Sequence, residues 1–197
     1  MQEREPAFER LLALLSDRLS PHGTDSARAL QEALKAPRFG TPTGKAASVP
    51  GCAFLPEALD GADDMLRAAM AGISEELSWR VPGFCRLPDE LGARMAAVVL
   101  VGPGGMIHHD EVSLGLILLG PRLQYPSHSH AAEELYLVLS GTLQWQIDGQ
   151  PIGTVRAGQF VHHRPWQGHA MSTGPRPALL FWGWLGDIRG ETYSMQD

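Results

Sequence analysis

The sequence predicts a mainly β protein with an α-helical N-terminal extension. Apolar residues in the first third recur every three or four positions, which is the period of an amphipathic helix. From about residue 78, short β-branched and aromatic runs alternate with Gly, Pro and Asp, a pattern typical of an all-β sandwich or barrel. We therefore expect a helical extension over residues 1–77, packed on a β-barrel over residues 78–197.

The N-terminal part predicts three helices. The first spans Glu5–Ser20, where five apolar residues share one helical face. The second begins after the capping oxygens around Thr24 and continues to about Lys35. A Pro- and Gly-rich loop from Pro37 to Gly51 separates it from a third helix, predicted from about Glu57 to Leu77.

The rest of the chain predicts a series of short strands. Their expected ranges are Arg94–Val101, Leu114–Leu119, Glu134–Leu139, Leu143–Ile147, Gly153–Arg156, Phe160–His162, His169–Thr173 and Ala178–Trp184. The dipeptide Asp148-Gly149 between two of them is a hairpin turn signal. This regular spacing of strands and turns favours a closed or sandwiched sheet.

Composition narrows the class of protein. The 197 residues are 44% hydrophobic and carry a net charge of −6, which argues against disorder and against sequence-independent nucleic-acid binding. Apolar runs fall far short of the roughly 20 residues that span a membrane, and the charged start has no signal core. Two cysteines, Cys52 and Cys85, make no disulfide framework. We expect a cytoplasmic protein with no nucleic-acid or membrane partner.

Histidines gather in the second half of the chain with the spacing of metal ligands. If His128 and His130 lie in extended chain, both side chains point to the same side. Glu134 can reach the same point across a short Ala-Ala turn, and His169 offers a further imidazole at the start of a strand. Two or three imidazoles with one carboxylate bind a divalent transition metal and leave a position open.

The same residues resemble the motifs of the cupin superfamily. The string His128-x-His130-x3-Glu134-x6-Gly141 matches the first cupin motif in its His, Glu and final Gly. The second motif is looser, and its residues follow the expected order: Gly158, Pro165, Gly168 and His169. The resemblance implies a double-stranded β-helix, or jelly-roll barrel, around one metal site.

A narrower resemblance covers most of the chain. Tyr125 before the His-x-His, Tyr136 after Glu134, a C-terminal Trp-x-Trp, the helical first third and a length near 200 are similar to the bacterial cupin-type dimethylsulfoniopropionate (DMSP) lyases, the short Q subgroup in particular. That family implies cleavage of DMSP to dimethyl sulfide and acrylate at one metal ion.

The resemblance also implies a ligand set. Carried over by position, His130, Glu134 and His169 are metal ligands, while His128 either binds the metal or orders the site. Mixed nitrogen and oxygen ligands accept zinc, iron, manganese, cobalt or nickel, so the sequence leaves the metal open.

The reaction is a β-elimination, which needs a base and a site for the sulfonium group. The resemblance implies that Tyr136 is a further ligand or a base and that Tyr125 is a base or a substrate contact. A divalent cation next to a tyrosine favours its phenolate form, which is consistent with a role as base. Aromatic faces attract a sulfonium cation, and we expect Trp184, Trp182 and Trp166 to bind substrate.

Two other functions remain open from the sequence. One is a different metal-dependent cupin enzyme, such as a dioxygenase, an isomerase or a lyase acting on another small acid. The other is a non-catalytic cupin that binds a small molecule. A tyrosine pair beside the metal motif favours the lyase, because a binding module needs no base. A homodimer is a further expectation that the sequence does not decide.

Overall fold

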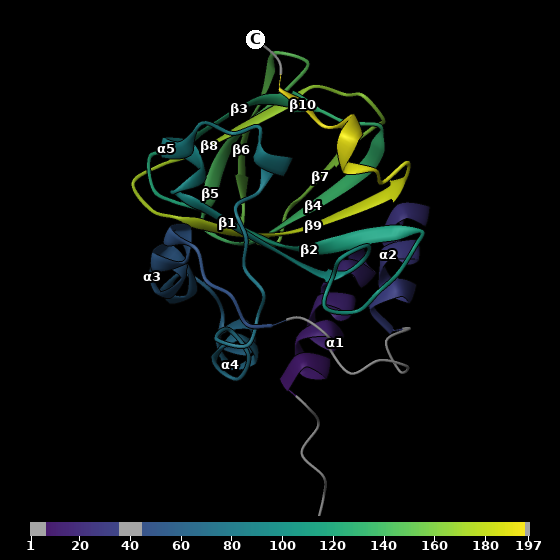
Figure 1. Cartoon of the computed structure of the whole chain (residues 1–197), viewed down its shortest axis with the longest axis vertical. Helices are drawn as coiled ribbons and strands as arrows, with labels where there is room; N and C mark the ends of the chain where they lie inside the picture. The colour runs from purple at the N-terminus through teal and green to yellow at the C-terminus, as the bar shows by residue number, and fades with distance from the viewer. Residues whose placement is uncertain (1–6, 36–44, 196–197) are drawn as a thin grey trace, which may run out of the picture.

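The computed structural model describes residues 7–35 and 45–195, and two facing antiparallel sheets form its centre (Figure 1). The first sheet has the order β1-β2-β9-β4-β7, with strands Met95–Val101, Val112–Leu119, Ala178–Gly186, Ala132–Ser140 and Phe160–His163. The second has the order β10-β3-β8-β5-β6, with strands Ser194–Met195, Gln124–Ser129, His169–Thr173, Thr142–Ile147 and Gln150–Arg156. This is a jelly-roll arrangement of two facing sheets, so the predicted mainly β fold class with an N-terminal helical extension is confirmed.

The helices lie on the outer side of the first sheet (Figure 1). Their bounds are α1 Ala7–Leu19, η1 Ser20–His22, α2 Asp25–Lys35, η2 Pro50–Phe54, α3 Leu55–Asp60 and α4 Asp64–Ala71. Shorter turns follow within the barrel region: η3 Gly83–Cys85, α5 Asp89–Gly92 and η4 Gly190–Thr192. The start of the first predicted helix and residues 37–44 of the predicted loop lie outside the described residues.

The third predicted helix, Glu57–Leu77, is wrong as a single element. The structure divides it into α3 and α4 and ends the second at Ala71. The break has a local cause, because the Asp63 side chain accepts a hydrogen bond from the Leu66 N–H at 2.9 Å and caps a new helix. The apolar period continues across this break, so periodicity alone did not reveal it.

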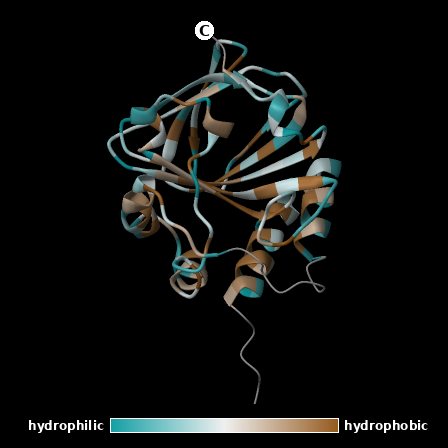
Figure 2. Cartoon of the chain, viewed as in Figure 1, coloured by the Kyte–Doolittle hydropathy of each residue, from teal (hydrophilic) through white to brown (hydrophobic). Residues whose placement is uncertain are grey.

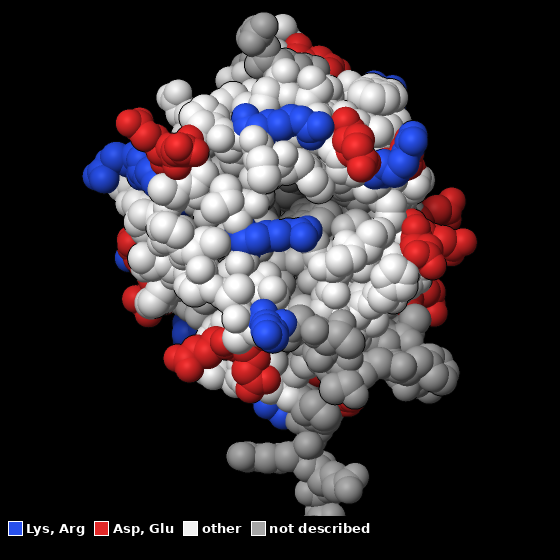
Figure 3. All heavy atoms as spheres, viewed as in Figure 1, with Lys and Arg blue, Asp and Glu red and all other residues white. Residues whose placement is uncertain are grey.

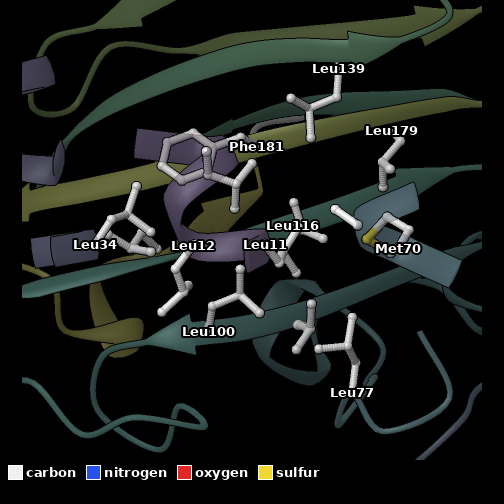
Figure 4. Packing of buried hydrophobic residues seen from close by; sticks show 14 of the residues in the cluster. Leu11, Leu12, Leu34, Met70, Leu77, Leu100, Leu116, Leu139, Leu179 and Phe181 are labelled. Atoms are coloured by element: carbon white, nitrogen blue, oxygen red, sulfur yellow. The ribbon is translucent and has the colours of Figure 1, made fainter. Parts of the chain in front are cut away.

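Aliphatic side chains join the helices to the outer face of the first sheet. Figure 4 shows Leu11, Leu34 and Met70 from the helices packed against Leu116 and Phe181 from the strands. Each fully buried side chain of this kind contributes roughly 1.5–3 kcal/mol relative to exposure. Hydrophobic colour runs through these strands and the helix sides that meet them (Figure 2). The helical extension therefore covers the sheet rather than the barrel opening.

The sequence pattern does not predict two of the strands, β3 and β10. Strand β3 is polar and contains Pro126, and β10 is only two residues long. Their pairing places Met195 opposite His128 and brings the C-terminal segment against the barrel. Within residues 7–35 and 45–195, no helix is long and apolar enough to cross a membrane.

Candidate metal centre

Strand register brings three ligand-type side chains to one point inside the barrel. His130 Nε2 lies 3.0 Å from Glu134 Oε2, and His169 Nε2 lies 3.1 Å from the same oxygen. All three residues are buried, with at most 2% of each exposed. Their donor atoms lie within 4.8 Å of one another, as the ligands of one metal ion do.

The hydrogen bonds of the two imidazoles fix which nitrogen faces the centre. His130 Nδ1 contacts the Ala132 carbonyl oxygen at 3.1 Å, and His169 Nδ1 contacts that of Gln167 at 2.9 Å. Because a carbonyl only accepts, each Nδ1 carries the proton and donates it. Each Nε2 that faces the Glu134 carboxylate therefore either donates a second proton to Oε2 or keeps its lone pair, which a metal ion can bridge to the carboxylate. A cation fits this arrangement of acceptors, and His169 Nε2 is a buried atom with no hydrogen-bond partner.

His128 lies beside this group of three. Its Nδ1 donates to the Pro126 carbonyl at 2.9 Å, so its Nε2 is also an acceptor. Its ring centroid is 4.1 Å from that of His169 and 4.2 Å from the stacked ring of Tyr125. The structure thus places His128 at the centre but outside the set whose donor atoms converge most closely.

The loop before His169 is held by the predicted hairpin turn. Asp148 and Gly149 both have positive φ angles, 50° and 74°, as a type I′ turn requires. The Asp148 carboxylate accepts the Gly168 N–H at 3.0 Å, and the Asp148 N–H donates to the Gly168 carbonyl at 2.7 Å. The Asp148-Gly149 turn that the sequence predicts therefore also positions His169, a candidate ligand.

Glu134 sits between two strands whose side chains reach its carboxylate. Trp184 Nε1 donates to Oε1 at 2.7 Å, and His163 Nδ1 lies 3.7 Å from Oε2. Burial alone would raise the pKa of Glu134, but the imidazoles of His130, His163 and His169 hold it well below its usual value. The carboxylate is therefore charged, as a metal ligand must be.

A cavity of about 430 Å³ opens onto this group. Seven of the nine site residues predicted from the sequence line it: Tyr125, His128, His130, Glu134, Tyr136, Trp182 and Trp184. His169 lies beside it through its contact with Glu134. Trp166 is not brought to the cavity, because its side chain is 59% exposed and only its backbone N–H contacts His130, at the carbonyl oxygen.

All three tyrosines of the chain line this cavity. The hydroxyl oxygens of Tyr125 and Tyr193 are 2.9 Å apart. Burial raises the pKa of Tyr125 and of Tyr136 well above the usual range, and it raises that of Tyr193 to about 12. Without a nearby positive charge these phenols stay protonated, so a tyrosine base here depends on a cation.

The sequence pattern does not predict several residues that line the cavity. Tyr193 and Phe84 come from segments far from the motifs, and their rings lie 5.7 Å apart. Phe84 also stacks on Trp184 at 5.8 Å and is 47% exposed, at the cavity mouth. The count of only three tyrosines was the one signal that could have found Tyr193; Phe84 left none.

Arg80 adds a cation to the cavity lining, far along the chain from the carboxylate of Glu134. Its backbone forms a bridge with Ala97, so both side chains share the inward face and the small Ala97 leaves room. Arg80 as a whole is exposed, but the protein atoms around its guanidinium desolvate it and lower its pKa. Within the described residues its side chain has no hydrogen-bond or ion-pair partner. Figure 3 shows a hollow on this face with basic side chains above and below it.

Comparison with known proteins agrees with this geometry. A sequence model of the dimethylsulfoniopropionate lyase family matches residues 22–180. The chain belongs to the DMSP lyase family. The family resemblance predicted from the two motifs and the flanking tyrosines is thereby confirmed.

Named members of the family resemble the chain over different lengths. Dimethylsulfoniopropionate lyase DddQ of Ruegeria pomeroyi is 29% identical over 95% of this chain and 94% of its own length. A putative dimethylsulfoniopropionate lyase, DddL of Cereibacter sphaeroides, is 32% identical over 70% of this chain and 60% of its own length. The crystal structure of the Ruegeria pomeroyi DddQ superposes with a TM-score of 0.77 at 27% identity, covering 98% of this chain and 97% of that one.

Proposed function

We propose that this protein is a metal-dependent lyase that cleaves DMSP to dimethyl sulfide and acrylate. The observation that carries the proposal is the convergence of His130, Glu134 and His169 in a tyrosine-lined cavity of a DMSP lyase family member. When bound there, a divalent ion supplies a Lewis acid for the negative charge that develops on the substrate carboxylate. The mixed ligand set suits zinc, iron, manganese, cobalt or nickel.

The base in this proposal is a tyrosine. A phenolate takes the proton on the carbon next to the carboxylate, the Cα–Cβ double bond forms, and the Cβ–S bond breaks to release neutral dimethyl sulfide. Tyr136 shares the inward face of β4 with Glu134, and Tyr125 stacks on His128. Both sit beside the candidate centre, so either one is in place to accept the proton.

The cavity lining offers groups for both charges of a zwitterion. The rings of Trp182 and Trp184 meet at 5.7 Å, and with Phe84 they provide faces for the sulfonium cation. Arg80 offers a positive charge to the carboxylate of DMSP.

Replacing Arg80 by Gln is expected to raise the KM for DMSP about tenfold, because a hydrogen bond between the guanidinium and the substrate carboxylate is lost. Steady-state kinetics measure this KM, and an unchanged value would mean that Arg80 does not contact the substrate.

Three further expectations belong to the same proposal. Cys52 and Cys85 are both free thiols, as proteins of the reducing cytosol have, and support a cytoplasmic location. A homodimer, which the sequence leaves undecided, is testable by sedimentation of the purified protein. Trp166 stays a predicted substrate contact only if substrate binding brings it to the cavity.

The test is a product assay on the full-length protein. The metal-free protein is loaded with each of the five metals, supplied with DMSP, and assayed for dimethyl sulfide in the headspace and acrylate in solution. We expect equal amounts of both products with at least one metal. No product with any of them would overturn the lyase and leave another cupin enzyme or a binding protein as the explanation.

A further inference from the structure

The Glu134 carboxylate is clamped by side chains of both neighbouring strands. On β4, Glu134 stands directly opposite Trp184 of β9 on one side and His163 of β7 on the other. Trp184 Nε1 donates to Oε1 at 2.7 Å, while Oε2 is the oxygen that faces the imidazoles. The two oxygens therefore have different partners: Oε1 accepts the indole N–H, and Oε2 faces the imidazoles.

A second tryptophan acts on the other oxygen through His163. An indole N–H only donates, so Trp145 Nε1 donates to His163 Nε2, at 3.1 Å. In the neutral ring this leaves the proton on Nδ1, which has no other hydrogen-bond partner and lies 3.7 Å from Glu134 Oε2. Trp145 and His163 are both completely buried, so no water competes for these contacts.

We propose that Trp184 is a positioning residue for the metal. Its indole N–H binds Glu134 Oε1 and thereby orients Oε2 toward His130 and His169. Trp145 supports the same orientation through His163. The Trp184 contact is a short charge-assisted hydrogen bond, whereas the His163 contact is longer than one. Trp184 thus contributes more than Trp145.

Trp184 then has a second role beside the substrate contact expected from the sequence. Its ring lines the cavity, but its N–H is already engaged by the carboxylate. Removing the N–H leaves Oε1 as a buried charged acceptor without its strongest partner, and the carboxylate can then turn away from the imidazoles. Loss of such an outer contact typically weakens metal binding 10–100-fold.

The chain offers a matched control. Trp182 lies two residues away on the same strand face and lines the same cavity, and within the described residues its N–H makes no hydrogen bond to Glu134. Replacing a tryptophan by Phe keeps an aromatic ring and removes the N–H. The pair Trp184→Phe and Trp182→Phe therefore separates the hydrogen bond from the loss of ring area.

The experiment measures zinc affinity of the full-length protein by competition with a chromogenic chelator. Relative to Trp182→Phe, we expect Trp184→Phe to raise the zinc Kd at least tenfold and Trp145→Phe to raise it roughly threefold. The visible d–d bands of the Co²⁺-loaded protein should shift in Trp184→Phe and stay in place in Trp182→Phe. A Trp184→Phe Kd within twofold of the control, with unshifted bands, would overturn the proposal.

Melting of the metal-free variants guards against a purely structural effect. If Trp184→Phe leaves no folded protein, Trp145→Phe decides: a Kd several-fold above the control supports the inference, and one within twofold of it rejects it. The inference rests on the metal site of the proposed function and not on its substrate. Because zinc affinity is measured without DMSP, its failure is distinguishable from a failure of the lyase assay.

Discussion

The two faces of the first sheet are equally buried and chemically opposite. Along β4, Leu135, Leu137 and Leu139 point outward into the aliphatic layer under the helices. The residues that alternate with them, Glu134, Tyr136 and Val138, point into the barrel, where imidazoles, indoles and phenols gather. One strand therefore contributes to stability with its odd-numbered residues and to the candidate site with its even-numbered ones.

This difference shows how little burial alone says about role. Leu137 and Glu134 have almost the same exposure, 3% and 2%, yet one meets only apolar groups and the other receives hydrogen bonds and close imidazole contacts. Because side chains alternate with a period of two, a slip of one residue in register would exchange the two layers. Substitutions on the outer face should thus affect mainly stability, and substitutions of the polar residues on the inner face should affect mainly metal binding and turnover.

Glu134→Ala is expected to have the largest effect. It removes the carboxylate that both imidazoles face, so metal binding and turnover should be lost together, while the outer layer and the fold persist. Metal content by mass spectrometry and circular dichroism of the same sample check this. Full metal occupancy in the variant would mean that the ligand set is wrong.

Tyr136→Phe and Tyr125→Phe test the inner face without touching its charge. Whichever tyrosine is the base, its loss should lower kcat by roughly 10²–10⁴-fold, with the metal content and melting temperature close to those of the parent. Steady-state kinetics of the metal-loaded variants give the answer. Near-normal rates in both would remove tyrosine from the mechanism.

Leu137→Ala tests the outer face of the same strand. It should lower the free energy of unfolding by about 2–5 kcal/mol through lost burial and a residual cavity. The kcat of the folded fraction should stay within about twofold, because the side chain points away from the cavity. Denaturant titration and kinetics of one preparation compare the two quantities; a large fall in kcat would break the separation between the faces.

Asp63→Asn probes the helical layer and has the smallest expected effect. Arg18 holds the pKa of Asp63 below its usual value, so the ion pair stabilises the fold above about pH 4 and is lost as the pH falls further. Since both groups are partly exposed, we expect at most about 1 kcal/mol at pH 7. The difference between parent and variant should vanish near pH 2; a constant difference would contradict the assignment.

Periodicity and motif spacing predicted correctly the features that depend on local sequence pattern. The alternation along Glu134–Leu139 predicted both faces of β4, and the motifs predicted which side chains converge. The prediction of one helix over Glu57–Leu77 was wrong because a capping hydrogen bond from Leu66 to Asp63 interrupts a continuous apolar period.

Other site residues depend on tertiary register that the sequence does not reveal. Tyr193 reaches the cavity through the pairing of β10 with β3, and Arg80 through an isolated bridge to Ala97. The alternation around Trp184 placed its ring in the barrel. Only the pairing of β9 with β4 shows that its N–H meets Glu134.

The central claim is that cleavage of DMSP depends on one metal ion held at the inner face. The most direct measurement is a titration of metal into the metal-free protein, with the rate of dimethyl sulfide release followed at each step. We predict no release before metal is added, a linear rise to one equivalent and a plateau beyond it. Release without metal, or none from protein with one equivalent bound, would contradict the account.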